Sequence, residues 1–190
     1  EEAVKHIKSG DTVVLAHCVG EPPALVDAMV KNADQYENVE IKHMVSLGSG
    51  SYTAPGMEKH FRANPMFLSG NVRNAVEEGR GDFTPVFFHE IPKLIREGKL
   101  KCDVAMAQVT PPDENGYCSL GTSVDYTFQA IKTARLVLVQ VNDQMPRTFG
   151  EKVHVDDFDY IVEASIPLYE LKQAKITEVE EKIGSYCASL

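Results

Sequence analysis

The chain has 190 residues, enough for one domain with a buried core and short for two. Its apolar content of 43% and charged content of 25% are those of a soluble globular protein. The formal net charge of -9 argues against nucleic acid or an anionic membrane as a partner, because both need a basic surface. An anionic ligand would therefore have to be held by local groups.

Nothing in the chain indicates a membrane span or an export signal. No apolar stretch approaches the ~20 residues that a spanning helix needs, and the start EEAVKHIKSG lacks the basic-then-apolar order of a signal peptide. The cysteines show neither CxxC pairing nor the even spacing of a disulfide scaffold, which favours reduced, mostly buried thiols; they are Cys18, Cys102, Cys118 and Cys187. We expect a cytoplasmic protein.

Both ends resemble cut helices. Apolar residues at helical spacing precede Gly10, and the last apolar face, residues 179–190, runs up to Leu190 without a capping glycine or polar tail. We therefore expect residues 1–190 to be a fragment of a longer protein.

Apolar, β-branched runs alternate with amphipathic segments along the chain. We predict strands at Thr12–His17, Val39–Leu47, Cys102–Val109 and Arg135–Val141. We predict helices at Ala24–Ala33, Val72–Glu78, His89–Glu97 and Tyr126–Thr133, the third with Pro92 in its first turn. This alternation indicates an α/β fold with an open, mainly parallel sheet and helices on both faces.

In such a sheet ligands bind beyond the carboxyl ends of the strands, so the loops after the four predicted strands should share one edge. The loop Thr110–Tyr126 is dense in turn formers, from Pro111 to Gly116, and Ser123 then leads into a helix near Asp125. The segment Asp156–Pro167 could cross to a separate layer.

The loop Gly48-Ser49-Gly50-Ser51-Tyr52 could bring backbone N–H groups and two hydroxyls against a carboxylate or phosphate, because glycine permits close approach. The alternative is a plain flexible turn. A dinucleotide fingerprint is excluded, since the third glycine is missing and the loop follows the second strand instead of the first.

His17, Cys18 and Glu21 lie between a predicted strand end and a helix start. A Cys/His nucleophilic pair is disfavoured, because adjacent strand residues point to opposite faces. Lining of a pocket by His17 or Glu21 is the more credible function, since a carboxylate there would feel the helix dipole and a histidine could titrate near neutrality.

Two further pairs of residues could either bind a ligand or stabilise the local structure. Arg73 and Arg80 could each hold a carboxylate with two parallel hydrogen bonds, or form surface ion pairs. Asn142 and Arg147 follow a buried strand directly, where polar side chains turn into a cleft or fix the loop. The scattered histidines contain no HExxH pattern, so no metal is expected.

Three segments make the chain similar to a known family: NVRNAVEEGRGDFTPVFFHEIPKLI (Asn71–Ile95), TPPDENGYCSLGTSVDY (Thr110–Tyr126) and VNDQMPRTFG (Val141–Gly150). In this order they resemble the acetyl-CoA hydrolase/transferase family of coenzyme A transferases, especially those acting on 4-hydroxybutyrate or on butyrate and acetate. The resemblance covers nearly the whole chain and corresponds to the amino-terminal half of such enzymes.

The resemblance implies transfer of CoA from an acyl-CoA to a short-chain carboxylate through a glutamyl-CoA thioester. In the family the glutamate lies in the carboxy-terminal half, which places it beyond Leu190, and this half alone should be inactive. No covalently bound cofactor is implied; the CoA thioester is the substrate. The expected partners are these substrates and the chain's own carboxy-terminal domain, with a homo-oligomer possible. The substrate-binding candidates are His17, Glu21, Gly48, Ser49, Gly50, Ser51, Arg73, Pro111, Gly116, Ser123 and Asn142.

Two other functions stay open at this point. Relatives that share the motifs hydrolyse acyl-CoA, with water in place of the acceptor acid. A noncatalytic α/β module that binds a carboxylate or nucleotide, or a scaffold domain, is also consistent with the chain.

Overall fold

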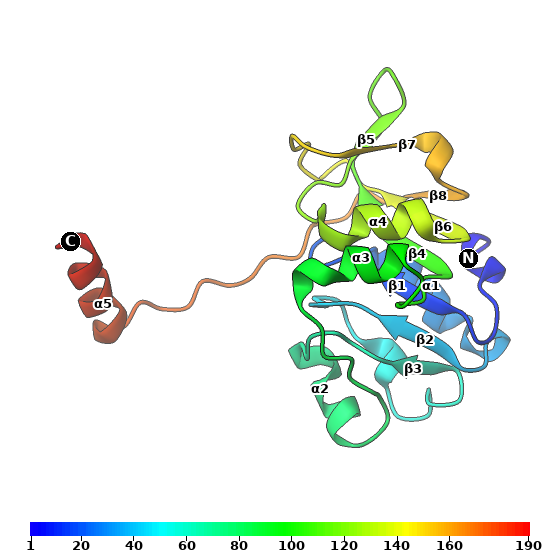
Figure 1. The fold of residues 1–190 in the computed structure, drawn as a ribbon, viewed down its shortest axis with the longest axis horizontal. Helices are drawn as coiled ribbons and strands as arrows, with labels where there is room; N and C mark the ends of the chain where they lie inside the picture. The colour runs from blue at the N-terminus through cyan, green and yellow to red at the C-terminus, as the bar shows by residue number, and fades with distance from the viewer.

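A computed structural model describes all of residues 1–190. Its centre is a six-stranded sheet in the order β3-β2-β1-β4-β6-β8, and every neighbouring pair is parallel (Figure 1). The strands are β1 (Thr12–Leu15), β2 (Val39–Lys42), β3 (Phe61–Ala63), β4 (Val104–Val109), β6 (Leu136–Val141) and β8 (Tyr160–Glu163). The predicted parallel α/β sheet is confirmed.

Both faces of the sheet are covered, and the alternation of β1 shows how. Val13 and Leu15 pack into one core with helices α1 (Pro23–Lys31) and α2 (Gly70–Glu77). Val14 and Ala16 pack into a second core with α3 (Ile91–Arg96) and α4 (Asp125–Thr133). Since successive strand residues point to opposite faces, a fully apolar strand such as β1 requires helices on both sides.

The strand order reverses at the centre of the sheet. From β1 the chain builds outwards through β2 to β3, and it then returns to the other side of β1 and builds outwards through β4, β6 and β8. The loops that follow β1 and β4 therefore leave the sheet side by side and diverge. This is a topological switch point, the place where open parallel sheets bind ligands.

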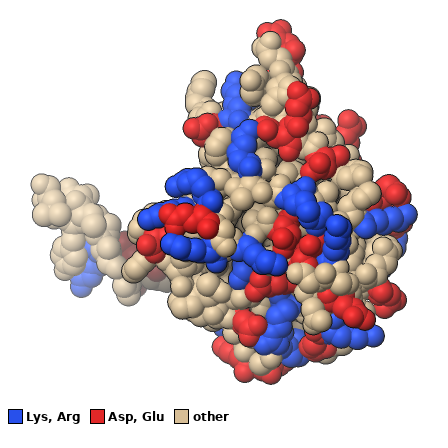
Figure 2. Space-filling view, turned by 45° about the vertical axis from the view of Figure 1, so that its right-hand side comes forward, with Lys and Arg blue, Asp and Glu red and all other residues tan.

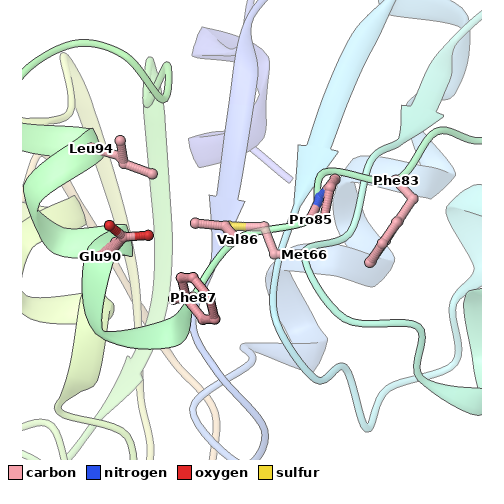
Figure 3. A pocket seen from close by; sticks show the side chains of 7 residues that line it. All are labelled: Met66, Phe83, Pro85, Val86, Phe87, Glu90 and Leu94. Carbon is pink, nitrogen blue, oxygen red and sulfur yellow. The ribbon is translucent and has the colours of Figure 1, made fainter.

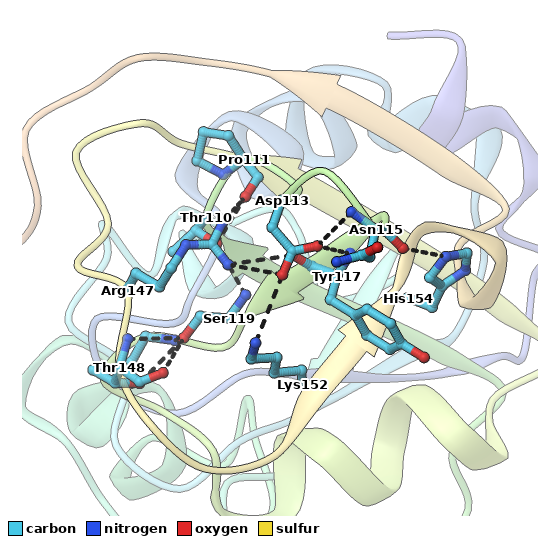
Figure 4. Close-up of polar contacts among 11 residues, drawn as sticks. Thr110, Pro111, Asp113, Asn115, Tyr117, Ser119, Arg147, Thr148, Lys152 and His154 are labelled. Atoms are coloured by element: carbon cyan, nitrogen blue, oxygen red, sulfur yellow. Dashed lines mark hydrogen bonds and ion pairs between the residues drawn. The ribbon is translucent and has the colours of Figure 1, made fainter.

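A two-stranded antiparallel ribbon projects beyond α4, formed by β5 (Tyr117–Ser119) and β7 (Lys152–His154) (Figures 1 and 4). Asp113 stabilises the turn that leads into this ribbon, because its carboxylate accepts hydrogen bonds from the backbone N–H groups of Asn115 and Tyr117 at 3.0 and 2.9 Å. Arg147 donates to the carbonyl oxygens of Pro111 and Tyr117. The loop after β4 is thereby tied to the segment after β6.

The carboxy-terminal part lies away from the body. Residues 170–190 are exposed throughout, and α5 (Glu178–Ala188) stands apart at the end of an extended segment (Figure 1). Val179, Ile183 and Leu190 of the predicted apolar face are more than half exposed, and so is the neighbouring Tyr186. No helix is long and apolar enough to cross a membrane. On the face shown in Figure 2 acidic and basic side chains are interspersed.

Several predicted boundaries were wrong. The second strand ends at Lys42 instead of Leu47, because the chain turns away to form the polar loop that follows. Residues Asp156–Pro167 do not cross to another layer; they contain β8, which pairs with β6 at the sheet edge. The short strands β3, β5 and β7 were missed, since three residues are too few to show a period. The amino-terminal helix is a single 3-10 turn, Ala3–His6.

Candidate functional site

The loops after β1, β2 and β4 meet at the carboxyl edge of the sheet. Cys18 forms an isolated parallel bridge to Ser46, so the first two loops stay in register beyond their strands. Gln108 near the end of β4 holds the β1 loop by donating two hydrogen bonds: its backbone N–H donates to Gly20 O at 2.8 Å and its side-chain amide donates to Val19 O at 2.9 Å. The predicted shared edge is present, and buried amides assemble it.

His17 lies at this edge and pairs with an acid from α4. Its Nδ1 lies 3.0 Å from Asp125 Oδ2, and the two side chains are 21% and 17% exposed. The Phe88 ring meets the imidazole edge-on with ring centroids 5.1 Å apart. Asp125 thus fixes the ring orientation and leaves Nε2 as the nitrogen without a protein partner. An imidazole held in this way can donate or accept one hydrogen bond at a ligand.

Ser123 connects the β1 loop to the start of α4. Its Oγ donates to His17 O at 2.5 Å and accepts the N–H of Gly20 at 3.1 Å. Position 20 must be glycine, because a Cβ there would lie 2.7 Å from Ser123 Cβ. Ser123 is 2% exposed, so its hydroxyl supports the loop.

The predicted anion cradle is a tight turn held on one side by Asn71. The Asn71 amide donates to Gly48 O at 2.9 Å and to Ser46 Oγ at 2.7 Å. Gly50 has φ 63°, the left-handed region, and a Cβ there would lie 2.8 Å from Asn71 O. Ser49 is exposed, and its Oγ bonds Ser51 Oγ at 3.0 Å. The turn therefore presents hydroxyls outward on a fixed backbone.

Glu21 supports the same turn from the interior. It is 1% exposed, and its Oε2 accepts the N–H of Gly48 at 3.2 Å. Its Oε1 is buried without a hydrogen-bond partner, the one such side-chain atom in residues 1–190. Burial raises the pKa of Glu21 above its ordinary value, with hydrogen bonds from Ser46, Gly48 and Leu47 opposing the shift.

A buried His–Tyr pair lies behind the turn. His43 Nε2 meets the Tyr52 hydroxyl at 3.0 Å, and His43 Nδ1 lies 3.0 Å from Met44 O. Burial lowers the pKa of His43 to about 4 and raises that of Tyr52. The pair is neutral at physiological pH and belongs to the core that carries the turn.

Cys18 has φ 52°, a left-handed backbone that is rare for a residue with a side chain. Burial, followed by the charges of Asp125 and Glu21, raises its thiol pKa, which disfavours the thiolate. His17 directs its Nδ1 to Asp125, not to Cys18. The disfavoured Cys/His nucleophilic pair thus gains no support.

The two candidate arginines differ. Arg80 forms an ion pair with Glu78 at 2.6 Å and donates to Thr53 O, as the ion-pair reading predicted. Arg73 is exposed on α2 and bonds only Leu68 O, at 3.1 Å. Its guanidinium therefore keeps free donors for a carboxylate.

The remaining candidates lie apart from the turn and serve the loops. Asn142 is fully buried; its amide donates to Gln108 Oε1 and Ile166 O, both at 2.8 Å. Gly116, with φ 80°, lies in the β5–β7 ribbon, where a Cβ would meet His154 at 2.5 Å. Pro111 lines a cavity of about 380 Å³ at the ends of β4, β6 and β8, with Asp143 and Glu163 among its other residues. Ligand contacts by these three stay a prediction.

The largest cavity, about 540 Å³, is apolar and lies between α3 and the loop that precedes it (Figure 3). In Figure 3 its side chains extend from Glu90 and Leu94 on the helical side, through Val86 and Met66, to Phe83 on the other side. The lining residues are Met66, Phe83, Pro85, Val86, Phe87, Glu90 and Leu94. Because the neighbouring Phe88 contacts His17, this apolar space adjoins the carboxyl edge.

Sequence reasoning missed Asn71 and Asp125 as parts of this site. Both lay in quoted segments, and Asp125 stood at an expected helix start, where polar side chains meet ligands and caps. Their partners come from 23 to 108 positions away, which no local pattern reveals. Residues 1–190 contain no cluster of three His, Cys, Asp or Glu side chains that could hold a metal ion.

A doubly covered parallel sheet, with polar turns gathered at its switch point, defines this chain as an open α/β domain. Residues 1–167 match the family model described as "Acetyl-CoA hydrolase/transferase N-terminal domain". The chain belongs to this family, as its motifs indicated, and corresponds to the amino-terminal part of its members.

Individual relatives agree. The chain is 53% identical over 191 residues to the 4-hydroxybutyrate coenzyme A transferase of Clostridium kluyveri, matching 100% of this chain and 44% of that protein. Among solved structures, RipA from Yersinia pestis superposes with a TM-score of 0.91 at 28% identity over 100% of this chain and 47% of that one. The 4-hydroxybutyrate CoA-transferase from Porphyromonas gingivalis superposes with a TM-score of 0.80 at 33% identity, over 99% of this chain and 42% of that one. The chain thus spans less than half the length of these relatives.

Proposed function

We propose that this chain is the substrate-side domain of an enzyme that transfers CoA between an acyl-CoA and a short-chain carboxylate such as acetate. The acyl group would be 4-hydroxybutyryl, butyryl or acetyl. The observation that carries the proposal is the 53% identity, over the whole chain, to a protein named as a 4-hydroxybutyrate coenzyme A transferase. The nucleophilic glutamate is expected in the part of the protein that follows Leu190.

In this proposal the carboxylate of that glutamate attacks the thioester carbonyl, which gives a mixed anhydride and releases CoA thiolate. The thiolate then attacks the glutamyl carbonyl, which forms a glutamyl-CoA thioester and frees the first acid. An incoming carboxylate reverses both steps, so that no oxidant, reductant or water is consumed. The developing oxyanions need aimed hydrogen-bond donors and a site without bulk water.

The carboxyl-edge geometry supports this division of labour. Two acids at this edge are poor nucleophiles, because Glu21 is buried with a raised pKa, whereas the Asp125 carboxylate is engaged by His17 and Thr127. The turn at Ser49 and the Arg73 guanidinium keep free donors, and His17 Nε2 is free to donate or accept one hydrogen bond. This side of the cleft is suited to hold a carboxylate and leaves the nucleophile to the other domain.

The test is acyl-CoA:acetate exchange by the full-length protein and by residues 1–190 alone. We expect exchange by the full-length protein, a hydride-trapped glutamate beyond Leu190, and no exchange by the isolated chain. Substantial exchange by residues 1–190 would place catalysis in this half and refute the assignment. Thioester loss that continues without an acceptor acid would instead identify an acyl-CoA hydrolase. No turnover and no adduct would favour a noncatalytic binding module.

A further inference from the structure

The carboxyl of Glu21 lies directly beneath the turn that the proposed function assigns to the carboxylate substrate. A Cβ built on Gly48 would lie 2.2 Å from Glu21 Oε1 and 2.9 Å from its Cδ, so the carboxyl fills the space that any other residue at position 48 would need. Its Oε2 holds the Gly48 N–H at 3.2 Å. Glu21 and the turn are therefore in van der Waals contact.

No cation compensates Glu21. Its Oε1 is buried and has no hydrogen-bond donor, and the salt bridges of residues 1–190 do not include it. The ionisable groups that share its surroundings are acids and neutral groups from every neighbouring element. They are Asp27 on α1, Cys18 after β1, Tyr52 beside the turn, Tyr126 on α4 and Tyr169 in the carboxy-terminal segment, while Asp125, paired with His17, acts on Cys18 and Tyr126.

A buried carboxylate with an unpartnered oxygen is costly, whereas the neutral acid leaves a smaller penalty. The direction of the pKa shift agrees with this argument, because burial is its largest cause. The charge state also matters to the turn above. A negative charge immediately below the Gly48–Ser51 turn would repel an anion that the turn holds, and the intervening protein would screen that repulsion less than water does.

We propose that Glu21 is a positioning residue for the carboxylate substrate: its carboxyl fixes the Gly48 turn from below and, being buried without a cation, governs the charge on the floor of the anion site. The inference rests on the proposed function, because it assigns the acid substrate to this turn. It adds the residue that decides how the acid is held and at which pH it binds.

The test compares Glu21→Gln with wild type in the full-length protein, with the KM for acetate measured from about pH 5 to 9, the range that buried glutamates can reach. In wild type we expect the KM for acetate to rise about tenfold toward high pH, because the ionised Glu21 carboxylate would repel the acetate held by the turn above it. In Glu21→Gln, which cannot ionise, that rise should be lost while the KM for acyl-CoA keeps its wild-type profile. Equal profiles in both proteins would overturn the proposal.

Glu40→Gln is the matched control. Glu40 is a partly buried carboxylate on β2 that bonds Thr12 and Asn64, and it lies outside the proposed site. This change should lower stability without altering the pH dependence of the KM for acetate. A third variant, Glu21→Leu, removes the acceptor for Gly48, and we expect it to raise the KM for acetate about tenfold. A purely structural role would lower its stability and leave that KM unchanged.

A measurement without turnover separates failure of this inference from failure of the proposed function. In wild-type protein, carbon NMR of the side-chain carboxyl follows Glu21 directly. We expect titration above the ordinary glutamate range, and faster amide exchange of Gly48 in Glu21→Leu by about tenfold. Titration in the ordinary range would refute the inference even in an active transferase. An inactive protein with a protonated Glu21 would refute the proposed function instead.

Discussion

The contact between Gly20 and Ser123 gives the sharpest test of how the cleft is assembled. A Cβ added at position 20 would lie 2.7 Å from Ser123 Cβ, 2.9 Å from its Oγ and 3.2 Å from Ala16 Cβ. Gly20, Ser123 and Ala16 are all buried, so none of them can relieve the overlap by moving into water. Gly20→Ala therefore has to push α4 away from the β1 loop or break the bond that Gly20 donates to Ser123.

The magnitude follows from two contributions. Overpacking of a filled interior costs about 1–3 kcal/mol, and the lost hydrogen bond adds about 0.5–1.5 kcal/mol. We expect Gly20→Ala to lower the free energy of unfolding by about 2–4 kcal/mol. For a domain of this size each kcal/mol lowers Tm by about 2–4 °C, so that the expected loss is about 4–16 °C.

The assay is urea unfolding of residues 1–190, followed by circular dichroism, with Gly70→Ala as the control. Gly70 has an ordinary negative φ and no atom within 4 Å of a built Cβ, so its substitution should stay within about 0.5 kcal/mol of wild type. In a double-mutant cycle Ser123→Gly should recover part of the loss, because it removes the atoms that the new Cβ meets. A Gly20→Ala loss no larger than that of Gly70→Ala, or additive single effects, would refute the reasoning.

Three further outcomes test other parts of the structure. The buried His43 has a pKa of about 4 in the folded chain, against an ordinary value of 6.5. The neutral imidazole therefore contributes its full stability above pH 6.5, and this contribution is lost as the pH falls toward 4. Urea unfolding of wild type should show a loss of about 3 kcal/mol over that pH range, and His43→Gln should not show it. Cys102, whose pKa burial raises to about 12, should react with iodoacetamide at pH 8 far more slowly than the exposed Cys187, and mass spectrometry that found equal rates would contradict its environment. In residues 1–190 trypsin should cleave first after Lys172 and Lys175, which lie in the exposed segment before α5, and early cuts inside the sheet would contradict this order.

The sheet could be predicted from the sequence because its central strands are apolar on both faces. The strands β1, β4 and β6 are mostly apolar, and of their polar residues Gln108 and Gln140 bond each other inside the sheet. Such runs require helices on both sides, which fixes the class of fold. The short strands at the edges carry no comparable pattern, so their pairing was visible only in three dimensions.

The site was less predictable, because its residue types indicate polarity but not partners. Glu21 and Ser123 were expected to line a pocket, and the structure buries both against loop backbone. Asn142 illustrates the same ambiguity: a polar residue after a buried strand can face a cleft or lock a loop, and here its amide is occupied by Gln108 and Ile166. Sequence position identified the edge, whereas long-range hydrogen bonds decide which side chains remain free at it.

These bonds divide the edge into support and contact surface. The side chains of Ser123, Gln108 and Asn71 form hydrogen bonds with the loop backbones. The turn at Ser49 and the Nε2 atom of His17 therefore remain free for a ligand. A rigid support matters in carboxylate exchange, because both acids must approach the same acyl carbon along similar paths and small displacements are costly. Glu21 fits this requirement, since its carboxyl fixes the turn from the buried side through the Gly48 N–H.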